Sequence, residues 1–297
     1  MIGLPPELDG VVHRYVDVPS ARLHVAEAGE GEPIVLLHGW PQHWWIWRKV
    51  IPALAEDRRV ICPDLRGFGW SEAPRGRYEQ SEFATDVLAL LDRLGLDQVD
   101  LIGHDWGGYT GFLLCLDAPQ RIRCYLALGV VHPWFEPPAP SPKMLQRTAY
   151  QFVLASPGLG EGVLRLLPGF VKLALRRGAH PEMRWSEGEL DCYAQSFRPR
   201  DHALASSHVY RSFLLRELPR LKKGHYRSRR SPVPTLLLHG DADPVIRPDI
   251  LAGYEPYADE MSVEEVERCG HFVAEEQPEL VVERARQLFG PGAAKPA

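Results

Sequence analysis

The chain has 297 residues, 45% of them hydrophobic, which suits one large α/β domain with an insertion or two ordinary domains. Its formal net charge of −5 gives no electrostatic reason to expect a DNA or RNA partner, because phosphate binding draws on clustered positive charge. Apolar runs stay far below the roughly 20 residues of a membrane-spanning helix, so we expect no membrane insertion.

The cysteines indicate a reduced protein without a metal centre. Their number is odd, they are far apart in the chain, and most of them fall in apolar patterns typical of a core. The sequence has no CxxC pair or histidine–cysteine cluster, and residues 1–10 lack the features of a signal peptide. We therefore expect a cytoplasmic monomer or homodimer that uses no metal and no cofactor.

The first predicted elements are an antiparallel pair of strands, Val11 to Val18 and Arg22 to Ala28, in which apolar and polar residues alternate. Short, continuous apolar runs follow, and these are typical of buried parallel strands. The runs are Ile34 to Leu37, Val60 to Cys62, Val99 to Ile102 and Tyr125 to Leu128. Helical patterns lie between them at Trp44 to Leu54 and at Ser81 to Leu94, closed by Gly95. This order predicts the α/β class, with a mostly parallel sheet flanked by helices.

The alternation of strand and helix stops after Val131, where a run of prolines begins. Residues 135–232 carry helical patterns without convincing strands, so we expect them to form an inserted helical cap. Strands return at Pro234 to Leu238 and Ser262 to Val266, and a helix after Pro278 ends the pattern. The predicted core therefore comprises residues 1–134 and 233–297.

The pattern Gly103-His104-Asp105-Trp106-Gly107 lies between a predicted strand and a predicted helix. It has the spacing of the nucleophile elbow of α/β-hydrolases, with aspartate where serine is usual. A carboxylate that attacks an ester or amide carbonyl yields a reactive anhydride, whereas its attack at a saturated carbon yields a stable alkyl ester. Asp105 therefore indicates substitution at an sp³ carbon.

A general base and an acid that orients it are expected to follow the nucleophile, with the acid first in the chain. Asp243 follows the strand that ends at Leu238, and His271 follows the next predicted strand. We predict a catalytic triad of Asp105, His271 and Asp243, in which Asp243 fixes the imidazole tautomer. Asp241 remains an alternative acid, because the sequence does not show which carboxylate faces the imidazole.

A third motif, His38-Gly39-Trp40-Pro41, directly follows the apolar run that ends at Leu37. In α/β-hydrolases one oxyanion-hole N–H comes from this loop and another from the residue after the nucleophile. We therefore predict that the backbone amides of Trp40 and Trp106 form the oxyanion hole.

These motifs, with Asp64 to Ser71 between them, resemble the epoxide hydrolases of the α/β-hydrolase fold, particularly the soluble type of bacteria and animals. The resemblance covers nearly the whole chain and is strongest at Leu36 to Ala73 and Leu101 to Gly108. It implies an α/β-hydrolase core with a helical cap, and hydrolysis of an epoxide to a vicinal diol. Haloalkane and haloacetate dehalogenases share the elbow aspartate, so dehalogenation stays an alternative.

The resemblance further implies two cap tyrosines, the first in a Tyr-Gln-x context and the second followed by arginine. Tyr150 and Tyr210 match these contexts, and Tyr193 is the alternative for the second position. Opening of an epoxide generates an alkoxide that needs a proton, which a tyrosine hydroxyl supplies. A halide leaves without a proton, so paired tyrosines favour an epoxide as the substrate.

Three aromatic residues close to the motifs are candidates for contact with a small-molecule epoxide: Trp44, His132 and Trp134. We predict an enzyme that forms a covalent ester on Asp105, which water activated by His271 then hydrolyses. Besides a dehalogenase, the rivals are a non-catalytic ligand-binding protein on this scaffold and a biosynthetic enzyme that opens a tethered epoxide with an internal nucleophile.

Overall fold

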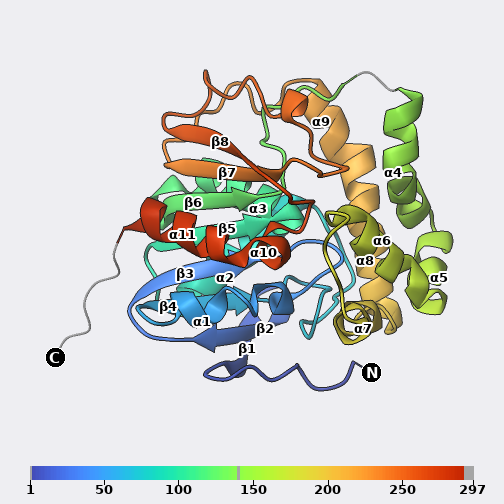
Figure 1. Ribbon diagram of the computed structural model, residues 1–297, viewed down its shortest axis with the longest axis horizontal. Coiled ribbons are helices and arrows are strands. Elements are labelled where there is room, and N and C mark those ends of the chain that lie inside the picture. The colour runs from blue at the N-terminus through green and yellow to red at the C-terminus, as the bar shows by residue number, and fades with distance from the viewer. Residues whose placement is uncertain (1, 139–140, 291–297) are drawn as a thin grey trace.

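One sheet runs through the middle of the protein, with helices on both of its faces (Figure 1). The computed structural model describes residues 2–138 and 141–290. Within these residues the sheet has the strand order β1-β2-β4-β3-β5-β6-β7-β8. The strands are β1 (Val12–Val18), β2 (Ala21–Ala28), β3 (Glu32–Leu37), β4 (Arg58–Pro63), β5 (Val99–His104), β6 (Ile122–Leu128), β7 (Thr235–Gly240) and β8 (Met261–Val266).

Most strands run parallel. β1 and β2 form an antiparallel hairpin, and β2 pairs antiparallel with β4. The pairings among β4, β3, β5, β6, β7 and β8 are parallel. The hairpin therefore extends one edge of a parallel sheet, and the predicted α/β class is confirmed.

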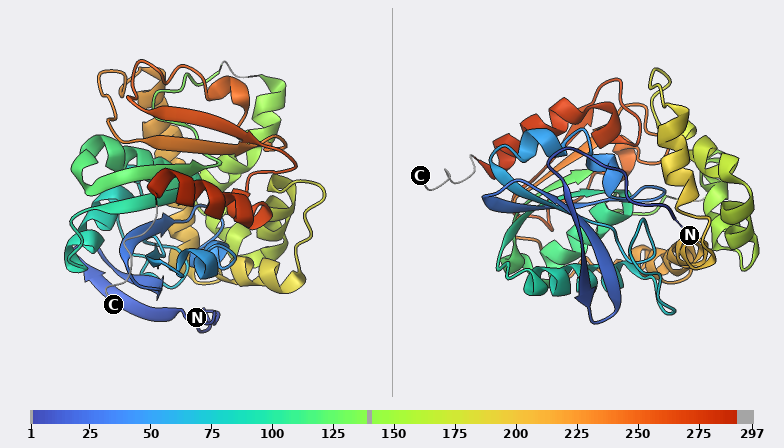
Figure 2. Two further views of the ribbon diagram at one scale, coloured as in Figure 1. Left: turned by 60° about the vertical axis from the view of Figure 1, so that its left-hand side comes forward. Right: turned by 90° about the horizontal axis from the view of Figure 1, so that it is seen from below.

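Two layers of helices bury the sheet, one on each face (Figure 2). One layer contains α2 (Gln80–Arg93) and α3 (Asp105–Asp117), and the other contains α1 (Ile51–Leu54), α10 (Val273–Glu276) and α11 (Pro278–Phe289). In β3, Val35 and Leu37 pack in the core with α2 and α3, whereas Ile34 and Leu36 pack in the core with α1 and α11. Successive side chains of a strand point to opposite faces, so a strand between two layers is apolar throughout.

Between β6 and β7 the regular elements within the described residues are helical. They are α4 (Pro142–Ala155), α5 (Leu159–Leu166), α6 (Pro168–Gly178), α7 (Glu187–Gln195), α8 (Arg200–Ser212), the π-helix η3 (Phe213–Glu217) and α9 (Leu218–Lys222). These inserted helices gather on the right of Figure 1. They lie at the carboxyl end of the strands, because Asp105 after β5 and His271 after β8 line a cavity together with α4. Residues 139 and 140 of the predicted cap lie outside the described residues.

The predicted helices are found with one correction. The helix predicted for Ser81 to Leu94 is α2, closed by Gly95 with a φ of +67°. The single helix predicted for Trp44 to Leu54 is wrong, because Trp44–Trp47 form a 3₁₀ turn and α1 begins only at Ile51. Pro52 has no N–H to donate to a preceding turn, so it starts a new helix and does not extend the earlier one.

Candidate active site

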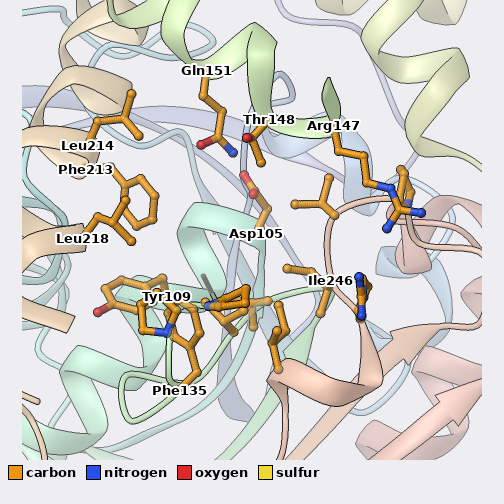
Figure 3. Close-up of a pocket in the computed structure, with 18 of the residues that line it drawn as sticks. Asp105, Tyr109, Phe135, Arg147, Thr148, Gln151, Phe213, Leu214, Leu218 and Ile246 are labelled. Atoms are coloured by element: carbon orange, nitrogen blue, oxygen red, sulfur yellow. The ribbon is translucent and has the colours of Figure 1, made fainter. Parts of the chain in front are cut away.

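Asp105 stands at the bend between β5 and α3 with a φ of +50°, a left-handed conformation that residues with a side chain rarely adopt. The bend requires small neighbours on both sides. A Cβ on Gly103 would lie 2.8 Å from the carbonyl oxygen of Gly107, and a Cβ on Gly107 would lie 2.4 Å from that of His38. This strained turn presents the Asp105 carboxylate to a cavity (Figure 3).

His271 lies between Asp105 and a second carboxylate, Asp243. The imidazole Nε2 is 3.6 Å from Oδ2 of Asp105, and its Nδ1 is 2.8 Å from Oδ2 of Asp243. The other oxygen of Asp243 accepts the backbone N–H groups of Val245 and Ile246 at 2.7 and 2.9 Å. These two hydrogen bonds hold the Asp243 carboxylate against the imidazole, and the structure thus brings the three predicted side chains together.

Asp241, the alternative acid, occupies a different place. Its two carboxylate oxygens accept the backbone N–H groups of Arg268 and Cys269 at 3.1 Å each. It therefore stabilises the loop before His271 from the protein surface. Asp243 is the carboxylate that contacts the imidazole.

Two carboxylates set the acidity of His271. Burial lowers the pKa of the imidazole, but the charge of Asp243 and the hydrogen bonds to Asp105 and Asp243 outweigh it and raise that pKa to about 10. The imidazole therefore holds a proton at neutral pH. A reaction that neutralises Asp105 removes part of this stabilisation, so it lowers the pKa of His271.

The loop after β3 supplies a hydrogen-bond donor to the Asp105 carboxylate. The backbone N–H of Trp40 donates to Oδ1 of Asp105 at 2.7 Å. His38 holds this loop, since its Nε2 accepts the N–H of Leu65 at 2.9 Å and its Nδ1 donates to the carbonyl of Gly39 at 3.1 Å. Burial lowers the pKa of His38, which keeps the ring in the neutral form that this arrangement requires.

Two phenols line the same cavities as Asp105. Tyr150 of α4 and Tyr210 of α8 have ring centroids 5.8 Å apart. Trp40 stacks on Tyr150 at 5.9 Å and meets Tyr210 edge-on at 5.4 Å. Burial raises the pKa of Tyr150 to about 12 and that of Tyr210 well above its usual range. Both hydroxyls therefore keep their protons at neutral pH and can donate them.

Tyr193, the alternative to Tyr210, is engaged elsewhere. Its hydroxyl donates to Oε1 of Glu275 at 2.6 Å, and it lines neither of the cavities that contain Asp105. Trp106 instead packs edge-on against Tyr210, with 5.5 Å between ring centroids. Tyr210 is thus the tyrosine that the structure brings next to Tyr150, while the role of the Trp106 amide as an oxyanion donor stays a prediction.

Two cavities meet at Asp105. Cavity 1 has a volume of about 340 Å³, and its walls are mainly apolar side chains from η3 and from the loops after β6 and β7 (Figure 3). Cavity 2 has a volume of about 680 Å³ and is lined by residues of both α4 and α6. The residues that line both cavities are Asp105, Arg147, Tyr150, Tyr210, Pro244 and Val245.

The three residues predicted to contact substrate lie outside both cavities. Trp44 is fully buried in the core. His132 is buried too, with its Nε2 3.2 Å from the carbonyl of Leu251, and the indole of Trp134 donates to the carbonyl of Tyr226 at 3.1 Å. These rings are close to the motifs in the chain, but they pack in the interior and not toward the cavities. An aromatic ring buries a large area, which favours this position.

The sequence analysis missed polar residues of α4 that line a cavity with Asp105. Thr148 and Gln151 lie above Asp105 in Figure 3, and Arg147 lies beside them. Residues 147, 148 and 151 have the spacing of one helical face, and this spacing is the signal that could have identified them. A polar face that lines a cavity has the same pattern as one that faces solvent, so the spacing alone did not identify it.

Within residues 2–138 and 141–290, no group of histidine, cysteine, aspartate and glutamate side chains is arranged to hold a metal ion. No helix in this part of the chain has the length and apolar character needed to cross a membrane.

Comparisons with known proteins place these features in a family. The profile of a family described as alpha/beta hydrolase fold matches residues 32–278. A soluble epoxide hydrolase of Corynebacterium sp. (strain C12) is 32% identical, over 95% of this chain and 98% of that protein. Haloalkane dehalogenase 2 of Mycobacterium bovis is 30% identical, over 96% of this chain and 97% of that protein. The solved structure of the epoxide hydrolase CorEH without ligand has a TM-score of 0.82 at 31% identity, and covers 94% of this chain and 98% of that one. The resemblance predicted from the motifs is thereby confirmed.

Proposed function

The chain belongs to the α/β-hydrolase fold family, and from this premise we propose that it is an epoxide hydrolase, which converts a small-molecule epoxide to a vicinal diol. The observation that carries the proposal is the pair of phenols, Tyr150 and Tyr210, in the same cavities as the Asp105 carboxylate. A carboxylate nucleophile together with proton donors for an alkoxide leaving group is the combination that epoxide opening requires.

Asp105 opens the epoxide in the first step. The Trp40 amide donates to Oδ1, and Oδ2, which faces His271 at 3.6 Å, forms the new bond to an epoxide carbon. The bond from that carbon to the epoxide oxygen breaks, and the alkoxide takes a proton from Tyr150 or Tyr210. The product is a hydroxyalkyl ester of Asp105.

His271 hydrolyses the ester in the second step. Esterification removes the charge of Asp105 and so lowers the pKa of His271, whose proton passes to the phenolate left by the first step. The neutral imidazole then takes a proton from water, and the hydroxide adds to the ester carbonyl. The Trp40 amide donates to the resulting oxyanion on Oδ1. When the ester bond breaks, the carboxyl proton of Asp105 neutralises the diol oxygen, and the charged pair of His271 and Asp105 is restored.

A His271→Gln variant tests this sequence because it lacks the base of the second step. Incubated with an epoxide, it should gain the mass of one epoxide molecule on the peptide that contains Asp105. The double variant with Asp105→Asn should gain none, and the exposed His225 provides a control variant, His225→Gln, that keeps turning over. An unmodified peptide from His271→Gln, alongside diol formation by the wild-type enzyme, contradicts the proposal.

Dehalogenation is a second candidate. The indole N–H of Trp40 is buried without a hydrogen-bond partner among the described residues, and N–H donors are what a departing halide requires. A haloalkane dehalogenase is also among the relatives. We expect diol from epoxides at a higher kcat/KM than halide from haloalkanes or haloacetate. Halide release without turnover of any epoxide would replace the first proposal with the second.

We also propose that the enzyme works in the cytoplasm, as the five free cysteines suggest. Five cysteines that form no disulfide fit a reducing compartment. Fractionation of the source cells, with activity and protein followed together, tests the location.

A further inference from the structure

Two arginines of cavity 2 lack the partners that most arginines of this protein have. Arg147 of α4 and Arg177 of α6 both line the cavity. Neither side chain forms an ion pair or a hydrogen bond with any residue in the described part of the chain. By contrast Arg176, the neighbour of Arg177, pairs with Glu187. Both guanidinium groups are therefore available to a ligand.

The helical spacing of α6 places Arg177 on the wall of cavity 2. The residues of α6 that line the cavity at the spacing i, i+3, i+4 and i+7 are Phe170, Leu173, Ala174 and Arg177. Arg177 lies in the last turn of the helix, beside Gly178, whose carbonyl accepts the N–H of His271 at 2.7 Å. The arginine is thus at the end of α6 that contacts the candidate catalytic loop.

Arg147 lines the same cavity from α4. It precedes Tyr150 by three residues on α4, a rise of about 4.5 Å along the helix axis. Like Tyr150, it lines both cavities. A charged group held by Arg147 would therefore lie in a cavity that also contains the Asp105 carboxylate.

The charges around cavity 2 do not balance. Among the described residues, Asp105 is the only carboxylate that lines it, and it faces His271, which also pairs with Asp243. Arg147 and Arg177 remain uncompensated in a protein whose formal net charge is −5. Cavity 1 differs, because its Arg247 is paired through two hydrogen bonds with Asp249. Lys222 and the shared Arg147 also line cavity 1.

We propose that Arg147 and Arg177 bind a carboxylate group of the substrate in cavity 2, so that the enzyme prefers epoxides that carry an anionic group. This inference rests on the proposed epoxide hydrolase function. A guanidinium group has a planar fork of N–H donors that matches the two oxygens of a carboxylate, which a single ammonium group does not.

The test compares two substrates that differ only in charge, the terminal epoxide of undecylenic acid and that of undecylenic alcohol. The measured quantity is the ratio of kcat/KM for the acid to kcat/KM for the alcohol. Each exposed charge pair contributes little, so we expect this ratio to fall about 5-fold in Arg147→Gln and in Arg177→Gln, and more in the double variant. Added salt should lower the ratio in the wild-type enzyme and have less effect in the double variant.

Two matched variants separate the proposal from a general effect of charge. Arg198 is exposed, lines neither cavity and has no side-chain partner in the described residues, so Arg198→Gln should keep the wild-type ratio. Lys222→Gln should keep it too, because the proposal assigns the anion to cavity 2. Any of three results overturns the proposal. The first is an unchanged acid-to-alcohol ratio in both arginine variants, and the second is an equal fall of this ratio in Arg198→Gln. The third is a ratio that falls in Lys222→Gln but not in Arg177→Gln. Turnover of the alcohol by the wild-type enzyme shows separately whether the proposed function holds.

Discussion

The backbone N–H of His271 donates to the carbonyl oxygen of Gly178 over 2.7 Å. This bond joins the last turn of α6, one of the inserted helices, to the loop that carries the candidate base. His104 of the elbow holds the same loop from the core, with its Nε2 2.8 Å from the carbonyl oxygen of His271. Burial lowers the pKa of His104 to about 4, so its neutral ring donates this bond at ordinary pH. The position of the imidazole therefore depends on both the core and the inserted helices.

Glu276 is expected to act as a positioning residue for His271. Its carboxylate accepts the backbone N–H groups of Gly270 at 2.9 Å, Phe272 at 3.0 Å and His180 at 2.7 Å. Glu276→Gln keeps the shape but replaces one accepting oxygen by an NH₂ group, which leaves backbone donors unsatisfied. We expect kcat to fall about 10-fold with little change in KM, which corresponds to an activation free energy higher by about 1.4 kcal/mol. Rapid-quench analysis should show the ester of Asp105 accumulating.

The exposed Glu279 supplies the control, since Glu279→Gln removes the same charge one turn away. That variant should keep the wild-type kcat. A Glu276→Gln enzyme whose ester does not accumulate, or whose loss is confined to KM, contradicts the positioning role.

The pKa of His271 should depend on the charge of Asp105. NMR titration of the imidazole is expected to give about 10 in the free wild-type enzyme, since Asp243 and Asp105 together raise the pKa. Asp105→Asn mimics the neutral ester, so the pKa should be lower in this variant. His225 is exposed and serves as an internal reference. Equal pKa values for His271 in the two proteins would show that esterification cannot prepare the base for the second step.

The same pKa makes stability depend on pH. Folding raises the pKa of His271 from about 6.5 to about 10, so the folded state binds this proton more tightly than the unfolded state does. The stabilisation is complete below pH 6.5 and disappears as the pH rises through about 10. The free energy of unfolding of wild-type protein should therefore exceed that of Asp243→Asn most at low pH, and the gap should narrow toward pH 10. Urea unfolding across this range checks the trend, with Asp249→Asn as the exposed control; a gap that widens with pH contradicts it.

Loss of either phenol should slow the first step. Tyr150→Phe and Tyr210→Phe remove a proton donor for the alkoxide while keeping the rings that pack on Trp40. General acid catalysis of this type contributes roughly 10²- to 10⁴-fold, and the partner phenol covers part of the loss. We expect single-turnover formation of the ester to slow by at least about 10²-fold in the double variant, with hydrolysis of the ester unaffected. Tyr193→Phe, which loses its bond to Glu275, should leave the rate of ester formation unchanged.

The core and the elbow could be predicted from the sequence because their signals are local. Buried parallel strands appear as apolar runs, and the bend at Asp105 needs small residues at fixed positions on either side. The order of Asp243 and His271 along the chain follows from the order of the strands at whose carboxyl ends they lie.

The cavities could not be predicted because they depend on how distant helices pack. Tyr150 and Tyr210 meet only where α4 and α8 pack together, and no local pattern encodes that contact. Trp44 and Trp134 illustrate the opposite error, since both lie near motifs in the chain and yet are buried away from the cavities. Their burial follows from the large apolar area of the indole ring.

Isotope labelling tests the covalent route most directly. Enzyme in molar excess over an epoxide, in ¹⁸O-labelled water, completes a single turnover in which water attacks the carbonyl carbon of the ester. The route through Asp105 predicts ¹⁸O in the carboxylate of Asp105 and a diol whose oxygens are both unlabelled. A labelled diol with an unlabelled Asp105 would mean that water attacks the epoxide directly, and this result would contradict the covalent mechanism.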